Sequence, residues 1–218
     1  QRPEQSNPWF YDSQWNCFPY FFYFCNKRYY FLKEKMLHLN FHPFPKINTQ
    51  RLVLRRLLKK DAAALFAIRN NAEAMRYIDR DPMKKLSEAT KLITTVQNNE
   101  FENKAILWVI SFKEMPEKMI GTICYWRIDP LNYRAEIGYI LHPGCWNKGI
   151  MHEAIQPVIQ YGFTKMNLHS IEAHINPANG ASEQILIKNG FIKEAHFKEC
   201  LFYNGRFLDT VVFSLLKK

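Results

Sequence analysis

Residues 134–166 decide the fold, and they read RAEIGYILHPGCWNKGIMHEAIQPVIQYGFTKM. Arg134–Leu141 predicts a β-strand, and a short loop, His142–Cys145, follows it. A long helix is predicted from about Asn147 to Met166, with a kink at Pro157. Its apolar residues recur along one side at helical spacing: Ile150, Met151, Ala154, Ile155, Val158, Ile159 and Phe163. This succession of strand, loop and helix brings the first turn of the helix to the end of the strand.

The loop before this helix predicts an anion site. The first turn of a helix leaves backbone N–H groups without internal partners and carries the positive end of the helix dipole, a combination that suits a phosphate. Gly149 lets the backbone come close to a ligand, and Lys148 adds a positive charge. On local grounds alone, a plain helix cap is the alternative interpretation of the same glycine.

Outside this stretch, further strands and helices alternate. Arg51–Leu57 alternates as a strand does, and Asp61 and Ser87 are the expected caps of helices that reach Asn70 and Glu100. The remaining elements are, in order, the strands Ala105–Phe112 and Met119–Ile128, the strand Ser170–Ile175, a helix from about Ala181 to Gly190, and a hairpin of Lys193–Tyr203 and Arg206–Leu216 around Asn204-Gly205. The predicted fold class is α/β (α+β), a mixed sheet flanked by helices.

The bulk composition limits the classes of function without choosing one. The net charge of +10 attracts phosphates of any kind, whether in nucleic acid, in membrane headgroups or in a phosphorylated cofactor. Lysines and arginines are spread along the chain without a recognition-helix or RNA-stacking motif, so we expect no direct nucleic-acid binding. No apolar run approaches the roughly 20 residues of a membrane helix, so we expect no membrane partner.

The cysteines give no sign of a disulfide framework or a metal site. Their number is odd, and they show neither CxxC nor Cys/His ligand spacing: Cys17, Cys25, Cys124, Cys145 and Cys200. The pattern predicts a protein without a metal in a reducing, cytoplasmic location.

Residues 1–45 differ from the rest and are left unassigned as an N-terminal extension. Residues 9–31 are crowded with aromatic side chains and follow neither the period of a strand nor that of a helix. The first methionine is Met36. We expect residues 1–35 to be either foreign to the native chain, added during cloning or by an over-extended gene start, or a genuine aromatic extension that forms a flap or an oligomer contact.

Five motifs occur in register along residues 46–218: TQRLVLR at 49–55, AEIGY at 135–139, CWNKGIMHEA at 145–154, NPANGAS at 176–182 and KNGF at 188–191. With them the chain resembles the GNAT superfamily of N-acetyltransferases, in particular its Rim-type (RimJ/RimL-like) branch, which acetylates the N-termini of ribosomal proteins. The resemblance implies one acetyltransferase domain over residues 46–218 and leaves the extension unmatched. Five ordered motifs are far more specific than any one of them.

The resemblance implies acetyl-CoA as cosubstrate, bound between two splayed central strands, Arg134–Leu141 and Ser170–Ile175. Its pantetheine arm is expected on the backbone around Ile140 and Leu141, with Asn179 as a hydrogen-bond partner. Its pyrophosphate is expected on the loop and helix start formed by Trp146, Asn147, Lys148, Gly149, Ile150 and Met151. The family's small residue is replaced by Met151, and the glycine common in the Rim-type branch by Asn147, so the loop is bulkier than the pattern.

The resemblance also implies direct transfer to an amine. Glu136 is the expected base, acting through water, and a plain strand charge or arginine partner is the alternative. Ser182 is the expected acid near the sulfur, although a tyrosine, Tyr139 or Tyr203, is open as well. A backbone N–H near Ile140 is expected to stabilise the oxyanion. In simpler interpretations Asn179 forms a turn and Ser182 caps the following helix.

The acceptor is the least determined part of the prediction. We expect a protein or peptide N-terminus, with a ribosomal protein among the candidates, and residues Tyr77 to Pro82 shaping the acceptor pocket. A small amine such as an aminoglycoside, polyamine or amino acid is the second enzymatic interpretation, and a non-catalytic acyl-CoA-binding protein is the third. A homodimer is also left open.

Overall fold

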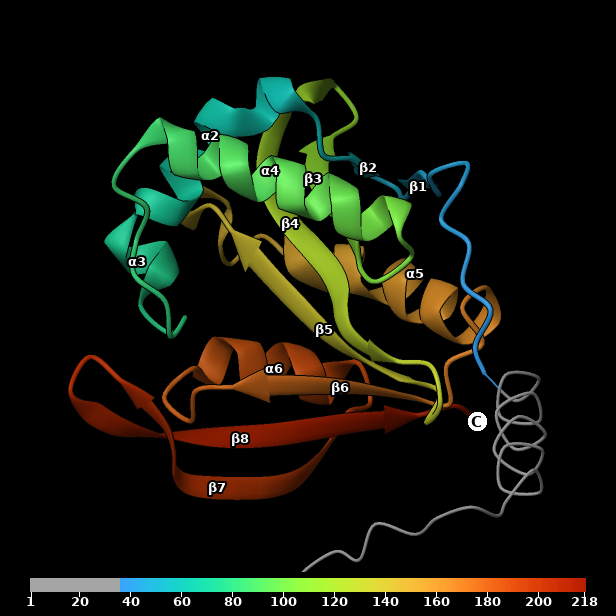
Figure 1. Cartoon of the computed structure of the whole chain (residues 1–218), viewed down its shortest axis with the longest axis vertical. Helices are drawn as coiled ribbons and strands as arrows, with labels where there is room; N and C mark the ends of the chain where they lie inside the picture. The colour runs from blue at the N-terminus through green and yellow to red at the C-terminus, as the bar shows by residue number, and fades with distance from the viewer. Residues whose placement is uncertain (1–35) are drawn as a thin grey trace, which may run out of the picture. The chain divides into compact units, whose positions relative to one another are not determined.

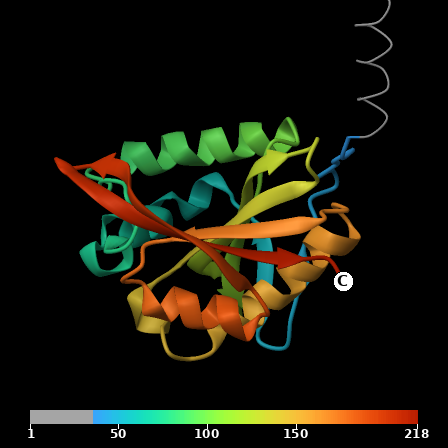
Figure 2. The ribbon, with the colours of Figure 1, turned by 90° about the horizontal axis from the view of Figure 1, so that it is seen from below.

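The computed structural model describes residues 36–218, in which an eight-stranded sheet carries helices on both faces (Figures 1 and 2). The predictions for the aromatic residues 1–35 lie outside the described residues. The elements are, in chain order, β1 (Ile47–Asn48), β2 (Leu52–Arg56), the 3-10 turn η1 (Lys59–Asp61), α2 (Ala62–Asn70), α3 (Ala72–Met75), α4 (Leu86–Phe101), β3 (Ile106–Phe112), β4 (Met115–Asp129), β5 (Arg134–Leu141), η2 (Pro143–Cys145), α5 (Ile150–Thr164), β6 (Ser170–Ile175), α6 (Gly180–Lys188), β7 (Ile192–Tyr203) and β8 (Arg206–Leu216).

The strands lie side by side in the order β1-β2-β3-β4-β5-β6-β8-β7. Every neighbouring pair is antiparallel except β5 and β6, which run parallel. The chain crosses from β5 to β6 through α5, as a parallel pair requires. The predicted mixed, mostly antiparallel sheet with flanking helices is therefore confirmed.

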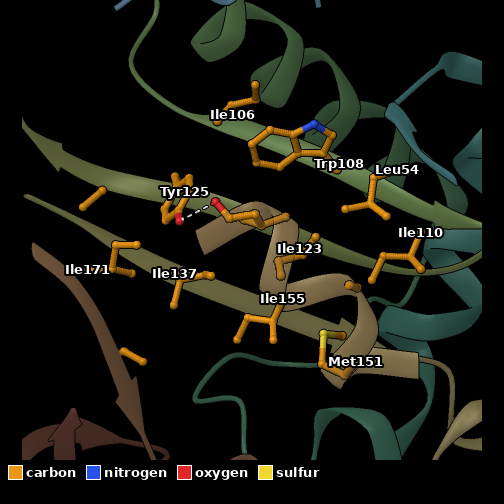
Figure 3. Close-up of a cluster of buried hydrophobic side chains, with 14 of the residues drawn as sticks. Leu54, Ile106, Trp108, Ile110, Ile123, Tyr125, Ile137, Met151, Ile155 and Ile171 are labelled. Atoms are coloured by element: carbon orange, nitrogen blue, oxygen red, sulfur yellow. Dashed lines mark hydrogen bonds between the residues drawn. The ribbon is translucent and has the colours of Figure 1, made fainter. Parts of the chain in front are cut away.

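Two apolar clusters hold the helices to the two faces of the sheet. The larger cluster joins α5 to the strands and includes Trp108, Tyr125 and Ile155, all fully buried (Figure 3). The smaller cluster joins α2 and α4 to the opposite face through residues such as Ile68, Ile93 and Val109. Figure 2 shows α4 on one side of the sheet and α5 with α6 on the other. Alternate residues of a strand point to opposite faces, and the central strands β3, β4 and β5 contribute to both clusters.

Several predicted helix boundaries were wrong, each for a local reason. Ser87 is not a cap, because α4 begins at Leu86 and Lys85 occupies the cap position. Asp61 does occupy the cap position of α2, which ends at Asn70 as predicted, but its carboxylate accepts hydrogen bonds from the Arg55 guanidinium and the Leu58 N–H rather than from the helix. The short elements β1 and α3 were missed, since two and four residues carry no readable period.

The hairpin signals were more reliable. Asn204 and Gly205 both have positive φ, 47° and 76°, as the tight turn between β7 and β8 requires. Gly190 has φ 85° and follows α6 as the expected left-handed residue, although the helix itself ends at Lys188. The predicted turn at residues 113–118 is shorter, because β4 already begins at Met115 and pairs with Phe112.

The packed part of the chain starts before residue 46. The compact unit begins at Leu37, whose side chain joins the larger apolar cluster together with the buried Phe41. Residues 37–45 therefore pack with the domain. Among the helices of residues 36–218, none is both long and apolar enough to cross a membrane.

Candidate active site

The parallel strands β5 and β6 separate along their length. They pair only at their first residues, from Arg134 opposite Ser170 to Glu136 opposite Glu172. Figure 1 shows the two strands diverging toward their carboxyl ends. Beyond Glu136, β5 therefore has an edge that β6 does not occupy, and this is the splayed pair that the family resemblance implies.

The backbone of β5 alternates between its two neighbours. The His142 N–H donates to Ile120 O across the β4–β5 pair, so the even-numbered residues 138 and 140 also direct their N–H and C=O groups toward β4. The groups that face β6 belong to Tyr139 and Leu141. The Leu141 carbonyl accepts a hydrogen bond of 3.0 Å from the Trp146 indole. The Ile140 N–H therefore points toward β4 and away from the gap between β5 and β6. A backbone N–H that faces this gap must belong to Tyr139 or Leu141.

The loop before α5 has a left-handed backbone at two positions. Asn147 has φ 58° and Gly149 has φ 70°, so α5 begins at Ile150 and not at Asn147 as predicted. Asparagine tolerates this conformation better than most residues, which explains how it stands in a glycine position. Successive N–H groups that alternate between left- and right-handed conformations form a concave anion site.

Two side chains of this loop and helix start are engaged elsewhere. Met151 is only 5% exposed and packs in the larger apolar cluster, while the Lys148 ammonium donates to Gly144 O at 2.7 Å. Met151, which replaces the small residue of the family pattern, is therefore accommodated in the core. The loop, the free first turn of α5 and Lys148 fit a pyrophosphate.

A second segment fixes this loop from the side. The Arg51 guanidinium donates to Lys148 O with both Nη atoms at 3.1 Å, and its Nε donates to Glu153 Oε2 at 2.6 Å. Glu153 Oε1 also accepts from the Thr49 hydroxyl at 2.5 Å and from the Arg51 N–H at 2.7 Å. Thr49 and Arg51 belong to one motif and Glu153 to another, so two stretches about a hundred residues apart meet at the anion loop.

Glu136 is a buried carboxylate beside the point where the strands separate. It is 7% exposed, and Arg127 Nη1 donates to its Oε2 at 3.0 Å. Burial raises the pKa of Glu136 above its ordinary value, while the charges of His174 and Arg127 oppose that shift. A carboxylate with a raised pKa binds a proton more readily, which suits a general base.

The hydroxyls of Tyr139 and Ser182 meet on the other face of β5. Their oxygens are 2.7 Å apart, and burial raises the pKa of Tyr139 to about 12. Ser182 does not cap α6. That role belongs to Asn179, whose side-chain oxygen accepts the Ser182 N–H at 3.2 Å. Asn179 therefore caps the helix, and the Ser182 hydroxyl is left to pair with Tyr139.

The described residues also form a pocket of about 390 Å³. Its walls come from residues 72–82 around and after α3, from residues 176–178 before α6, and from residues 203–208 at the tip of the β7–β8 hairpin. The Tyr203 hydroxyl donates to Asp81 Oδ1 at 2.8 Å, joining the hairpin to the loop after α3. The Tyr203 hydroxyl is thus already paired with Asp81. The segment that was expected to shape an acceptor pocket lines this pocket through Tyr77, Ile78, Asp79, Arg80 and Pro82.

Three participants were not identified from the sequence. Arg127 reaches Glu136 because β4 is irregular between Trp126 and Asp129, where Arg127 has φ 45°, and no sequence period marks that irregularity. No sequence motif marks His174, whose Nε2 lies 3.5 Å from Glu172 and which influences the pKa of Glu136. Glu153 lies within the motif at residues 145–154, but its role depends on contacts with Thr49 and Arg51, which are distant in sequence.

Comparisons with known proteins identify the family of the chain. A family model described as an acetyltransferase (GNAT) domain matches residues 51–192. The chain is 36% identical over 174 residues to the uncharacterized N-acetyltransferase YoaA of Bacillus subtilis, covering 80% of this chain and 98% of the relative.

Two solved structures share the fold. The ribosomal-protein-S5-alanine acetyltransferase of Vibrio fischeri is similar with a TM-score of 0.69 and 25% identity, over 79% of this chain and 96% of that one. The spermidine N-acetyltransferase of Vibrio cholerae, solved with CoA and spermine, is similar with a TM-score of 0.67 and 26% identity, over 76% and 95% of the two chains. The chain belongs to the GNAT family and is an acetyl-CoA-dependent N-acetyltransferase.

Proposed function

We propose that this N-acetyltransferase acetylates the α-amine of a protein or peptide N-terminus, as the Rim-type branch does, with Glu136 as the base. The observation that carries the proposal is the placement of a buried carboxylate where β5 and β6 separate, with a hydroxyl pair on the opposite face of β5. Acetyl transfer from a thioester needs both a proton acceptor for the amine and a proton donor for the sulfur.

The chemical step is a direct transfer. The neutral amine attacks the thioester carbonyl carbon, a C–N bond forms, and the carbonyl electrons move onto oxygen. Glu136, through a water, takes the proton that the nitrogen loses. When the tetrahedral intermediate collapses, the C–S bond breaks and the thiolate takes a proton from the Ser182–Tyr139 pair. Ser182 is the proposed acid, and Tyr139, whose pKa of about 12 keeps it protonated, is its proton source.

The cosubstrate is assigned to the surfaces that offer free donors. The pyrophosphate is proposed to rest on the turn from Trp146 to Met151, where Asn147, Lys148, Gly149 and Ile150 present backbone N–H groups. The pantetheine arm is proposed to follow the β5 edge near Ile140 and Leu141 and to reach Asn179. The alternation of β5 favours the N–H groups of Tyr139 and Leu141 for the thioester oxygen.

The test compares the rate of acetyl transfer by the wild type with that of a variant that lacks the Glu136 charge. We expect Glu136→Gln to lower kcat by roughly 100-fold with little change in KM for acetyl-CoA, because general base catalysis typically contributes a factor of this size. Free thiol release with an N-terminal peptide library is the measurement. Undiminished turnover would remove Glu136 from the mechanism.

Glu172 offers a matched control. It lies opposite Glu136 on β6 and pairs with Arg134 at 3.1 Å. Glu172→Gln makes the same chemical change one strand away, and we expect it to keep kcat within about threefold of wild type. Equal losses in the two variants would indicate a general electrostatic or folding effect rather than base catalysis.

A small-molecule amine is the second candidate acceptor, and the similarity to a spermidine N-acetyltransferase supports it. Thiol release with spermidine in place of the peptide tests it directly. A protein that only binds acyl-CoA would release no thiol with either acceptor.

A further inference from the structure

Arginines in this protein fall into two groups. Residues 36–218 contain nine arginines, and five of them form ion pairs with carboxylates: Arg51, Arg55, Arg56, Arg127 and Arg134. The other four have no carboxylate partner among the described residues: Arg69, Arg76, Arg80 and Arg206. Paired arginines have an evident structural use, and the unpaired ones need a different explanation.

Three of the four unpaired arginines gather at one place. Arg76, Arg80 and Arg206 all line the pocket of about 390 Å³. Arg69, on α2, does not line the pocket, but its charge interacts with that of Arg80, and its buried Nε has no hydrogen-bond partner within residues 36–218. Like charges repel, so three guanidinium groups without counter-ions around one pocket favour the entry of an anion.

Acidic residues of the pocket do not balance these charges. Asp79 is the one carboxylate among its lining residues. Asp81, close by, already accepts hydrogen bonds from Tyr203 and Asn204. Arg76 and Arg80 are held in place by aromatic rings, with their guanidinium carbons 5.3 Å from the Tyr77 ring centre and 5.6 Å from that of Trp126. Stacked guanidinium groups keep their N–H donors free for a ligand.

The pocket is on the same side of the sheet as the proposed base. Trp126 lies directly opposite Glu136 across the β4–β5 pair, and residues opposite one another point to the same face. The Trp126 indole covers Gly138, the next residue of β5 on that face. Arg80, stacked on this indole, is therefore a neighbour of the place where the acceptor amine must meet the thioester.

We propose that Arg76, Arg80 and Arg206 form an anion subsite, and that the acceptor is a primary amine carrying a carboxylate or phosphate close to the reacting nitrogen, in the first instance an acidic peptide N-terminus. This inference rests on the proposed function and narrows its substrate class. Guanidinium groups bind carboxylates and phosphates with two parallel hydrogen bonds, and they repel polyamines. The subsite thus selects against the second candidate acceptor.

The experiment compares acceptors that differ only in charge. Ser-Glu-Glu-Ala, Ser-Gln-Gln-Ala and Ser-Lys-Lys-Ala, each with an amidated C-terminus, are tested beside spermidine and free glutamate, with release of free CoA thiol as the readout. We expect kcat/KM for the acidic peptide to exceed that for the basic peptide by at least about tenfold at low salt, and the ratio to shrink at high salt. Glutamate distinguishes a free acidic amino acid from a peptide as the source of the anion.

Arginine variants test the residues. Arg76→Gln, Arg80→Gln and Arg206→Gln are each expected to lower kcat/KM for the acidic peptide by about tenfold, the scale of a charge-assisted hydrogen bond, and to leave the Gln peptide within about threefold. Arg206→Lys keeps the charge and should recover part of the loss. Arg134→Gln, at an arginine that already has carboxylate partners, is the matched control and should change none of the ratios.

The outcomes separate the two proposals. Transfer to all peptides without an acidic preference, or a preference for spermidine, overturns the anion subsite and leaves the acetylation of amines intact. Equal losses for acidic and neutral peptides in the arginine variants also overturn it. No thiol release with any acceptor would instead reject the proposed function on which the subsite rests.

Discussion

At the scale of single residues, the hydroxyl pair of Tyr139 and Ser182 makes a prediction about shared proton donation. If the two oxygens act as one donor, removing either should cost nearly as much as removing both. We expect Ser182→Ala and Tyr139→Phe each to lower kcat by about tenfold, and the double variant to be no more than about threefold slower than either. Single-turnover thiol release is the measurement. Multiplicative losses would mean that the two hydroxyls act independently.

Gly149 makes a prediction about the anion loop. An alanine Cβ there would touch only Arg51 Nη2, at an ordinary 3.7 Å, so the cost comes from the φ of 70°. A left-handed alanine costs roughly 1–2 kcal/mol. We expect Gly149→Ala to lower Tm by several degrees and to raise KM for acetyl-CoA, as followed by thermal unfolding and steady-state kinetics.

Gly180 is the control for Gly149. A Cβ at Gly180 meets nothing within 4 Å, and its backbone is helical. Gly180→Ala should therefore leave Tm unchanged or slightly raised. A loss of stability equal to that of Gly149→Ala would contradict the conformational argument.

Residue roles were only partly predictable from the sequence. Gly149 and Lys148 could be identified because they stand at the start of a strongly periodic helix. The Arg127–Glu136 ion pair could not be predicted, because it depends on an irregular strand that turns Arg127 back toward β5. The choice between Asn179 and Ser182 as helix cap likewise required the side-chain hydrogen bonds.

At the scale of elements, the contact between the turn before β2 and the start of α5 should determine cosubstrate affinity. Burial alone would raise the pKa of Glu153, but hydrogen bonds from Thr49 and Arg51 lower it overall. We expect Glu153→Gln to weaken the hold of Arg51 on Lys148 O and to raise KM for acetyl-CoA severalfold while kcat changes little.

Because the pKa of Glu153 is depressed in the folded state, its stabilising effect is present above the unfolded value, near about pH 4.3, and is lost as pH falls through the folded value. The wild type should therefore lose more stability than Glu153→Gln over that acidic window. Glu194→Gln is a suitable control, since Glu194 pairs with Ser214 on the β7–β8 hairpin. A KM for acetyl-CoA that is unchanged by Glu153→Gln would disconnect this contact from the anion loop.

Helices and strands with a long run of periodic apolar residues were predicted well. Element boundaries that depend on backbone geometry were predicted poorly. α5 was predicted from its apolar spacing, but its start was placed three residues early, because helix periodicity does not reveal that Asn147 and Gly149 are left-handed. The separation of β5 from β6 cannot be predicted from the pattern of apolar and polar residues in either strand. It was expected only through the family resemblance.

At the scale of the whole molecule, the packing of α5 on the sheet depends on one close approach. The Tyr125 hydroxyl donates to Val158 O at 2.9 Å, and a Cβ added at Gly162 would lie 2.5 Å from that hydroxyl (Figure 3 shows the tyrosine). We expect Gly162→Ala to destabilise the fold by about 1–3 kcal/mol through overpacking. Equilibrium denaturation measures the loss.

Tyr125→Phe removes the atom that an alanine at residue 162 would meet first. The double variant Tyr125→Phe with Gly162→Ala should therefore be less destabilised than the sum of the single variants. Additive losses would show that the contact between these two positions does not limit the approach of α5 to the sheet.

The arrangement of the whole sheet was predictable as a class, whereas its active-site chemistry was not. Alternating strands and helices with a strong final hairpin predicted the mixed sheet. The gathering of three unpaired arginines could not be predicted, because Arg76, Arg80 and Arg206 are spread over more than a hundred residues and mixed among arginines that have partners.

The measurement that tests the central claim most directly is the pH dependence of kcat/KM for one peptide acceptor in wild type, Glu136→Gln and Arg127→Gln. The base must be unprotonated, so the wild-type rate should fall as pH drops through the raised pKa of Glu136. The Arg127 charge lowers that pKa, so Arg127→Gln should move this fall to higher pH. Glu136→Gln should abolish the fall and leave only the titration of the acceptor amine. A fall that is identical in all three enzymes would contradict the assignment of Glu136 as the base.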